Sequence, residues 1–226
     1  MNDLASRRRY DDACGTAHAL DLVGERWALL VARELMLGPK RFSDLRAGLP
    51  GISANVLTQR LEGLEAAGVL TRRRLPPPAS VGVYELTSWG YELEPVILSL
   101  GRWAARSPGH DPTLPLSAAS LMFSFKAMFD PGALGDAGIV AGFRLGSEEF
   151  CVRVANGTAE PARQPAAEGD FILESSAEAI AAVVYGGVPM AKFEAVGALS
   201  LAGDRALAER FVGLFKLPAK AVVDKT

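Results

Sequence analysis

Three leucines, spaced four and three residues apart, most constrain how this chain can fold. Leu57, Leu61 and Leu64 form one narrow apolar stripe when residues 54–67 are projected on an α-helix. Such a stripe indicates a helix that packs one face against a core. The opposite face is polar and carries Asn55, Thr58, Gln59 and Glu62, with Arg60 on its flank. An ordinary surface helix would show the same pattern, so its surroundings decide its use.

The flanking residues predict where this helix begins and ends. Ser53 suits the N-cap and Gly68 suits the position after the C-terminus, which gives a helix from Ala54 to Ala67. A preceding core helix, with Trp27 and Glu34 at helical spacing, ends at Gly38-Pro39. Between them, Ser43 can cap a short helix that reaches Leu49, and Pro50-Gly51 forces a turn. The order predicts a helix-turn-helix.

A hairpin is predicted directly after this arrangement. The segments VLTRRRL and VYELT suit two short strands, and the connecting PPPASVG contains prolines that cannot lie inside a paired strand. A hairpin in this place is the wing of a winged-helix domain. Arg72, Arg73 and Arg74 would then contact backbone phosphates, although alternation turns one of them away from the other two. The alternative is a solvated strand end.

The polar helix face suits the reading of DNA bases. In the major groove Asn and Gln can form bidentate contacts with adenine, and Thr can contact a methyl group or form one hydrogen bond. We therefore expect double-stranded DNA as a partner. The predicted DNA-binding residues are Lys40, Arg41, Ser53, Asn55, Thr58, Gln59, Arg60, Arg72, Arg73 and Arg74.

Residues 10 to 106 closely resemble the HxlR-type winged-helix transcription regulators, relatives of the MarR group. The matching segments are LDLVGERW, LMLGPKRFSDLRAGLPGISANVLTQRLEGLEAAGVLTRR and YELTSWGYEL. The resemblance implies dimeric binding to pseudo-palindromic DNA. It also draws attention to Cys14, because a cysteine upstream of the LDL segment senses oxidants or electrophiles in some members. Gly15 replaces the usual proline after this cysteine, and Glu25 replaces a typical glycine.

The surroundings of Cys14 allow two interpretations. A sensor thiol needs exposure and a lowered pKa, which the nearby Arg7 to Arg9 would favour and the closer Asp11 and Asp12 would oppose. The alternative is an inert, buried thiol. With Cys151 as the only other cysteine, neither a disulfide framework nor a metal-ligand spacing is present.

A later helix, beginning near Ser88, offers a dimer contact. Its apolar residues follow a seam of three- and four-residue steps, which favours a partner helix, and Pro95 within it should bend the helix. We expect a homodimer through the N-terminal segment and this helix; packing onto the chain's own second domain is the alternative. The seam consists of Leu93, Val96, Ile97, Leu100, Trp103 and Ala104.

The length and composition suit one large or two small domains, and we expect two domains in a cytoplasmic protein. Residues 1–108 contain 14 Lys and Arg against 12 Asp and Glu, while the remainder contains 10 against 14. No apolar run approaches the roughly 20 residues that span a bilayer, and no signal peptide is evident. We expect a mainly α winged-helix domain at 1–108, a proline-rich linker at 109–116 and an α+β domain at 117–226.

The second domain is predicted as a largely antiparallel sheet covered by helices. Residues 139–145, 148–157, 170–174 and 198–204 suit strands, and Asn156-Gly157 suits a tight hairpin turn. Helices are expected over 116–129, after the capping box of Ser175 with Glu178, and after the cap Asp204. There is no GxSxG, no GxxxxGK and no metal-ligand cluster, so we expect neither an enzyme nor a cofactor.

Residues 115 to 217 resemble the sterol-carrier-protein-like fold in element order, in VGALSLAGD and in the helix ending VGLF. This resemblance implies a cavity for a lipid or another apolar ligand. The alternative is that each residue below is plain core. The candidate pocket residues are Phe125, Phe129, Phe143, Val184, Tyr185 and Phe193.

The sequence thus predicts a homodimeric DNA-binding regulator with an apolar-ligand domain. Two other functions stay open. One is a redox-sensing regulator that acts through Cys14. The other is a hydrolase or a lipid-transfer protein whose winged helix serves only assembly.

Overall fold

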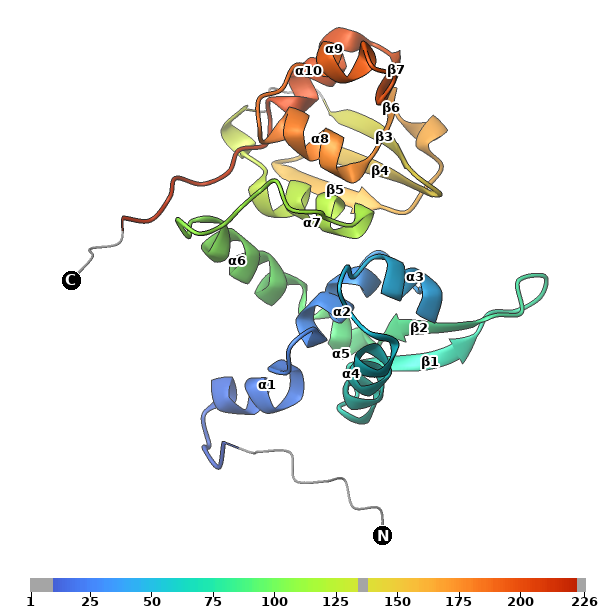
Figure 1. Cartoon of the computed structure of the whole chain (residues 1–226), viewed down its shortest axis with the longest axis vertical. Coiled ribbons are helices and arrows are strands. Elements are labelled where there is room, and N and C mark those ends of the chain that lie inside the picture. The colour runs from blue at the N-terminus through green and yellow to red at the C-terminus, as the bar shows by residue number, and fades with distance from the viewer. Residues whose placement is uncertain (1–9, 134–137, 223–226) are drawn as a thin grey trace. The chain divides into compact units, whose positions relative to one another are not determined.

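The computed structural model describes residues 10–133 and 138–222 (Figure 1). The chain divides into two compact units, Met1–Glu94 and Pro95–Thr226. The sequence predicted a boundary after residue 108, whereas this division falls at the start of helix α6 (Glu94–Ala105). Nearly all of α6 therefore belongs to the C-terminal unit. Within that unit, Arg102 Nη1 donates to the Ala127 carbonyl at 2.8 Å. The basic cluster Arg7 to Arg9 lies outside the described residues.

The N-terminal unit begins with two helices, α1 (Gly15–Val23) and α2 (Ala28–Leu35), where the sequence suggested a continuous core helix. The helical path breaks at Trp27, whose φ of 80° places it in the left-handed region. Glu34 and Leu35 of α2 are buried, in agreement with their predicted place on the core face. The chain leaves α2 through Gly38, which has a φ of 110°.

Helices α3 (Phe42–Ala47) and α4 (Ala54–Ala66) complete the helix-turn-helix. Ser43 lies inside α3 and is not its cap; the Asp44 carboxylate accepts a hydrogen bond from the Arg41 amide at 3.4 Å. The predicted ends of α4 are confirmed. The Ser53 hydroxyl accepts from the Val56 amide, and Gly68 adopts a φ of 74°.

Strands β1 (Leu70–Arg74) and β2 (Gly82–Leu86) form the predicted antiparallel hairpin, which projects beside α4 in Figure 1. Helix α5 (Ser88–Tyr91) follows, with Thr87 rather than Ser88 as its cap. The chain then turns before α6 begins. Pro95 therefore occupies the first turn of α6, where its missing N–H breaks no hydrogen bond, and it does not bend a longer helix as predicted.

The C-terminal unit is an α+β fold around a five-stranded mixed sheet. The strand order is β5-β4-β3-β6-β7, in which β3 and β6 are parallel and the other neighbours are antiparallel. Its strands are β3 (Ile139–Leu145), β4 (Glu148–Ala155), β5 (Thr158–Ala162), β6 (Phe171–Ser175) and β7 (Leu199–Gly203). Its helices are α7 (Ala118–Met128), α8 (Ala177–Val184), α9 (Met190–Glu194) and α10 (Arg205–Val212), with short 3₁₀ turns η1 (Pro131–Ala133) and η2 (Ala166–Glu168).

Local signals in this unit are mostly confirmed. Asn156 and Gly157 both have positive φ in the tight turn between β4 and β5. The Asp204 carboxylate caps α10 through the Leu207 amide at 3.2 Å. The predicted cap of α8 was wrong by one residue: the Ser176 hydroxyl accepts from Ala179, while Ser175 ends β6 and donates to the Ala198 carbonyl.

Candidate nucleic-acid interface

Helix α4 presents a buried face and a polar exposed face, as the leucine spacing predicts. Leu57, Leu61 and Leu64 are buried in the helical core, which fixes the rotation of the helix. The opposite side is exposed and unobstructed within this unit, so its amide and hydroxyl groups are available for hydrogen bonds. The exposed polar residues of this helix and its cap are Ser53, Asn55, Thr58, Gln59 and Glu62.

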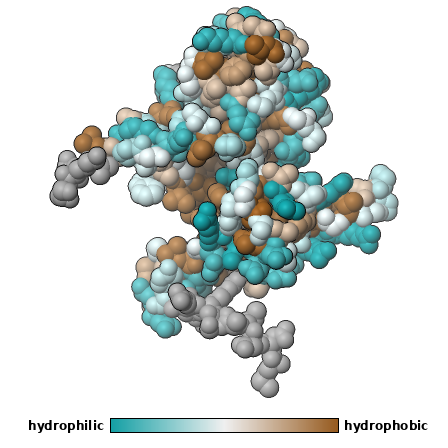
Figure 2. Space-filling view, viewed as in Figure 1, coloured by the Kyte–Doolittle hydropathy of each residue, from teal (hydrophilic) through white to brown (hydrophobic). Residues whose placement is uncertain are grey.

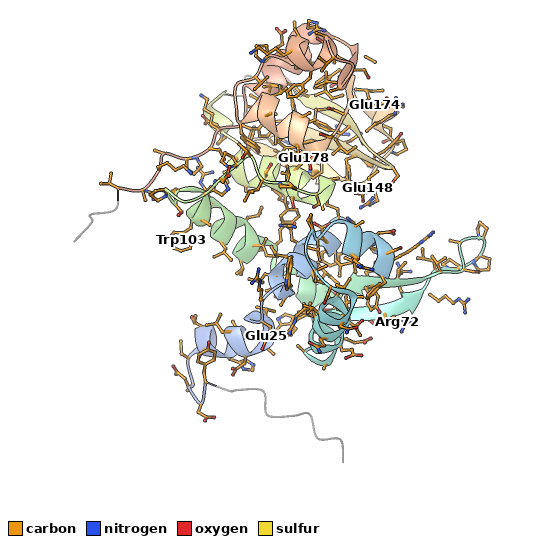
Figure 3. The ribbon with its side chains drawn as sticks, viewed as in Figure 1. Glu25, Arg72, Trp103, Glu148, Glu174 and Glu178 are labelled. Atoms are coloured by element: carbon orange, nitrogen blue, oxygen red, sulfur yellow. The ribbon has the colours of Figure 1, made fainter. Side chains whose placement is uncertain are left out.

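Arg60 differs from its neighbours because its guanidinium already has a partner. Its Nη1 lies 3.1 Å from Glu25 Oε2, on the turn between α1 and α2 (Figure 3). The Arg60 side chain is only 19% exposed, whereas that of Glu25 is 61% exposed. Arg60 therefore leans away from the reading face and toward the N-terminal helices. This partner was not predicted, since Glu25 and Arg60 lie far apart in the sequence.

The three wing arginines are all exposed but have different partners. Arg73 forms an ion pair with Glu85 on the adjacent strand. Arg74 Nε donates to the Ser80 carbonyl at 3.1 Å, and the Arg72 guanidinium lies 5.8 Å from the centre of the Tyr84 ring. Together with Gly82 they line an open hollow of about 530 Å³.

The side chains of this hairpin are those expected of a surface that faces phosphate. In Figure 2 the projecting hairpin carries hydrophilic residues (teal) interspersed with paler and hydrophobic ones. The ion pair between Arg73 and Glu85 was not predicted, although the hairpin register could have indicated it. In that register Glu85 lies diagonally across from Arg73 on the neighbouring strand.

Lys40 does not lie at the surface, which corrects its predicted place among phosphate-binding residues. Only 5% of the residue is exposed, and its Nζ donates to Glu34 Oε2 at 2.9 Å. The adjacent Arg41 is exposed at the start of α3. Lys40 is therefore a buried residue of the core, whereas Arg41 faces solvent.

Cys14 is exposed and stands at the N-cap of α1, so it is not the buried thiol of the alternative interpretation. Hydrogen bonds from the Thr16 and Ala17 backbone amides lower the pKa of its thiol below the usual value. Cys151, in contrast, is buried, and desolvation raises its pKa. The two thiols therefore differ in both solvent access and the direction in which their pKa is shifted.

Helix α6 carries an exposed apolar stripe in the part of the predicted seam formed by Val96, Leu100 and Trp103. Trp103 is 72% exposed and projects from the helix in Figure 3. Leu93 and Ile97 are half-buried. A row of large apolar side chains left in water is a typical mark of an interaction surface.

Three of the candidate ligand residues of the C-terminal unit, Phe125, Phe129 and Phe143, take part in aromatic packing. Phe125 and Phe143 are buried with ring centroids 5.4 Å apart, and both pack on Phe211. Phe129 packs on Phe215. These contacts make the predicted pocket phenylalanines part of a solid aromatic core.

The other candidate ligand residues also have different surroundings. Val184 is buried and Phe193 is half-buried. The Tyr185 hydroxyl bonds the Ser124 hydroxyl at 2.7 Å, and burial raises the pKa of this phenol.

A hollow of about 350 Å³ does exist in this unit, between α8, α9 and α10. Its lining is mainly apolar, with Arg205 and Glu209 at its edge, and none of the six predicted residues belongs to it. Arg205 Nη2 is held by Glu194 at 2.6 Å. The apolar residues are Val183, Val188, Pro189, Met190, Ala191 and Val212, beside Gly187.

Residues 10–133 and 138–222 contain no cluster of three or more His, Cys, Asp or Glu side chains that could hold a metal ion. No helix in the same residues has the length and apolar character needed to cross a membrane.

Sequence comparison connects this geometry with known proteins. Residues 22–111 match the model of the family described as HxlR-like helix-turn-helix. The chain is 37% identical over 86 residues to YvaP of Bacillus subtilis, an uncharacterized HTH-type transcriptional regulator, covering 38% of this chain and 80% of YvaP. It is also 37% identical over 86 residues to the HTH-type transcriptional regulator YodB of the same organism, covering 38% and 77%.

Among solved structures, the reduced form of YodB aligns with a TM-score of 0.39 and 33% sequence identity, over 44% of this chain and all of that one. Each relative covers about two fifths of the chain, and the family model ends at residue 111. The sequence relationship therefore concerns the helix-turn-helix part and leaves the C-terminal sheet without a counterpart in these relatives.

Proposed function

This chain belongs to the HxlR-like helix-turn-helix family of transcriptional regulators, and we propose that it binds double-stranded DNA as a homodimer. The observation that carries the proposal is the exposed polar face of α4 beside a wing with three exposed arginines. Helix α4 enters the major groove, where Asn55, Thr58 and Gln59 contact base edges. The wing arginines contact phosphates and hold the helix in register.

The test is selection of duplexes from a random pool, followed by measurement of Kd for selected and scrambled duplexes at increasing salt. We expect selected duplexes to share two half-sites, and log Kd to rise linearly with the logarithm of the salt concentration. Salt-independent or absent binding would contradict the proposal. It would favour the alternative in which the winged helix only mediates assembly of a hydrolase or lipid-transfer protein.

Dimerisation uses the apolar stripe of α6 and the N-terminal helix. Val96, Leu100 and Trp103 expose apolar area that a partner helix would cover, and Leu20 of α1 is exposed as well. Two recognition helices related by a two-fold axis then read two half-sites. Light scattering at micromolar concentration tests this arrangement, and a monomer would contradict it.

The C-terminal unit acts as an effector domain of sterol-carrier-like type, which binds an apolar molecule. Two features support the assignment of an apolar-ligand domain. One is the mixed sheet, with one parallel pair among antiparallel neighbours, and the other is the apolar hollow between α8, α9 and α10. Its volume falls within the range of small-molecule pockets. Native mass spectrometry of the purified chain tests the assignment through any retained ligand.

Redox regulation through Cys14 is a second candidate, favoured by the exposure and lowered pKa of its thiol. Oxidation or alkylation at the start of α1 would add bulk or charge beside the N-terminal dimer contact. If this candidate is correct, Cys14→Ser abolishes any change in DNA affinity on treatment with an oxidant, and the untreated affinity stays the same.

A further inference from the structure

A buried ion pair lies beneath the wing. Glu34 of α2 is fully buried and Lys40 is nearly so, and their side chains meet at 2.9 Å. The other Glu34 oxygen accepts from Arg33 Nη2 at 3.0 Å. The Gly48 Cα faces the same carboxylate, since a β-carbon there would lie 2.5 Å from Glu34 Oε2. The space around this carboxylate is therefore closely filled.

The backbone of Lys40 is at the same time part of the wing. Its amide donates to the Tyr84 carbonyl at 3.0 Å, and the Tyr84 amide donates to the Lys40 carbonyl at 2.8 Å. These two bonds add a one-residue third strand to β2. On the other side of β2, Tyr84 pairs with Arg72, whose guanidinium lies over the Tyr84 ring.

An isolated two-stranded hairpin is marginally stable in water and needs a third strand or packing against a helix to hold one position. Lys40 provides the extra strand pairing through its backbone and an attachment to α2 through its ammonium group. A charged pair suits this task, because a buried ammonium and carboxylate satisfy each other only in one geometry, whereas apolar contacts tolerate sliding.

We propose that Glu34 and Lys40 are positioning residues that fix the wing, and with it Arg72, at one angle to the recognition helix. Neither residue touches DNA. The inference rests on the proposed function, since it assigns the pair a part in DNA binding. It replaces the direct phosphate contact that the sequence suggested for Lys40.

The test uses the full chain with both charges removed, Glu34→Gln with Lys40→Met. Removing both members avoids an unpaired buried charge, which is the main cost of breaking such a pair. Arg33→Met is the matched control, because it removes a different partner of Glu34 and leaves the attachment to Lys40 intact. Thermal unfolding of each variant checks that it is folded at the temperature of the assay.

The decisive readout is a cycle with Arg72→Ala. In the parent chain Arg72→Ala should lower the salt slope by about 0.9, the value for one lost phosphate contact. In the double variant the slope should already be lower by a similar amount, and Arg72→Ala should change it no further. If Arg72→Ala lowers the slope equally in both backgrounds, the wing is positioned without the pair and the proposal is wrong.

Amide hydrogen exchange separates this inference from the proposed function, because it needs no DNA. In the double variant the Lys40 and Tyr84 amides should exchange at least ten-fold faster, while the Leu61 amide of α4 keeps its parent rate. Unchanged protection of Tyr84 would overturn the positioning role even if DNA binding is confirmed. Faster exchange with no DNA binding by the parent chain would contradict the proposed function alone.

Discussion

Arg60, the only basic residue of the recognition helix, is held 3.1 Å from Glu25 on the turn before α2. The Arg60 side chain is largely buried, and its Nε has no hydrogen-bond partner among the described residues. Helix α4 therefore contributes no free cation in this conformation. Its exposed charged side chains are the carboxylates of Glu62 and Glu65. Among the predicted DNA-binding residues, the exposed cations are therefore the wing arginines and Arg41 at the start of α3.

Replacing Glu25 with glutamine should tighten DNA binding. The variant keeps the shape of the side chain but frees the Arg60 guanidinium, which can then reach a backbone phosphate. We expect a salt slope steeper by about 0.9 and tighter binding to all duplexes alike. Fluorescence anisotropy across a salt series measures both quantities.

A second variant separates this effect from simple loss of negative charge. In an Arg60→Gln background, Glu25→Gln should leave the salt slope unchanged, since no arginine remains to be released. If the slope still steepens there, Glu25 acts through repulsion of DNA. If Glu25→Gln weakens binding in the parent chain, the ion pair instead orients Arg60 toward DNA.

Gln59→Ala should lower discrimination between selected and scrambled duplexes by about 1 to 3 kcal/mol, the range for a bidentate base contact. Gln59 is exposed on the face opposite the buried leucines, so the thermal unfolding temperature should stay near that of the parent. A variant of Gln59 that unfolds would show that this face belongs to the core.

The recognition helix could be predicted from the sequence because its determinants are local. Leu57, Leu61 and Leu64 set its rotation, and Ser53 and Gly68 set its ends within one or two residues. The hairpin could also be predicted, since strand propensity indicates its two strands and prolines indicate its loop. Such short-range signals do not depend on tertiary contacts.

The corrected assignments depend on contacts between residues distant in the sequence. From the sequence Lys40 resembles an ordinary surface lysine. In the structure its ammonium group bonds Glu34 and its backbone pairs with Tyr84 of β2, the second strand of the wing. The left-handed conformation of Trp27 was likewise not predicted, because residues other than glycine seldom adopt a positive φ. Phe125 shows the same limit: hydrophobicity predicts burial but does not separate a core residue from a cavity wall.

Arg73→Ala should weaken binding to all duplexes alike and reduce the salt slope, but by less than Arg72→Ala. The reason is the ion pair with Glu85, which already neutralises the Arg73 guanidinium and must be broken or shared when a phosphate approaches. Kd values for both variants across the same salt series make the comparison. A larger slope change for Arg73 than for Arg72 would contradict this ranking.

Cys14 should react with iodoacetamide faster than Cys151 and at lower pH than an ordinary thiol. Only the thiolate reacts, and the amides of Thr16 and Ala17 favour that form, so the rate should rise with pH through a midpoint that lies below the usual cysteine pKa. Burial slows Cys151 and raises its pKa. Mass spectrometry of digests at several pH values follows each site, and equal rates would rule out Cys14 as an activated thiol.

Leu100→Asp should dissociate the homodimer. Leu100 is exposed at the centre of the α6 stripe, between Val96 and Trp103, so a carboxylate there would be buried and unpaired in a dimer but solvated in a monomer. Gly101→Asp is the matched control, because it adds the same charge at an exposed position of α6 that lies away from the stripe and has space for a side chain. Analytical ultracentrifugation over a range of concentrations measures the shift.

The loss of dimerisation should also appear in DNA binding. A monomer can contact only one half-site, so Leu100→Asp should bind a duplex with two half-sites no more tightly than a duplex with one. The parent chain should prefer the two-site duplex strongly, because the second contact is intramolecular. If Leu100→Asp stays dimeric and keeps this preference, the interface lies elsewhere, and the α6 stripe has another partner.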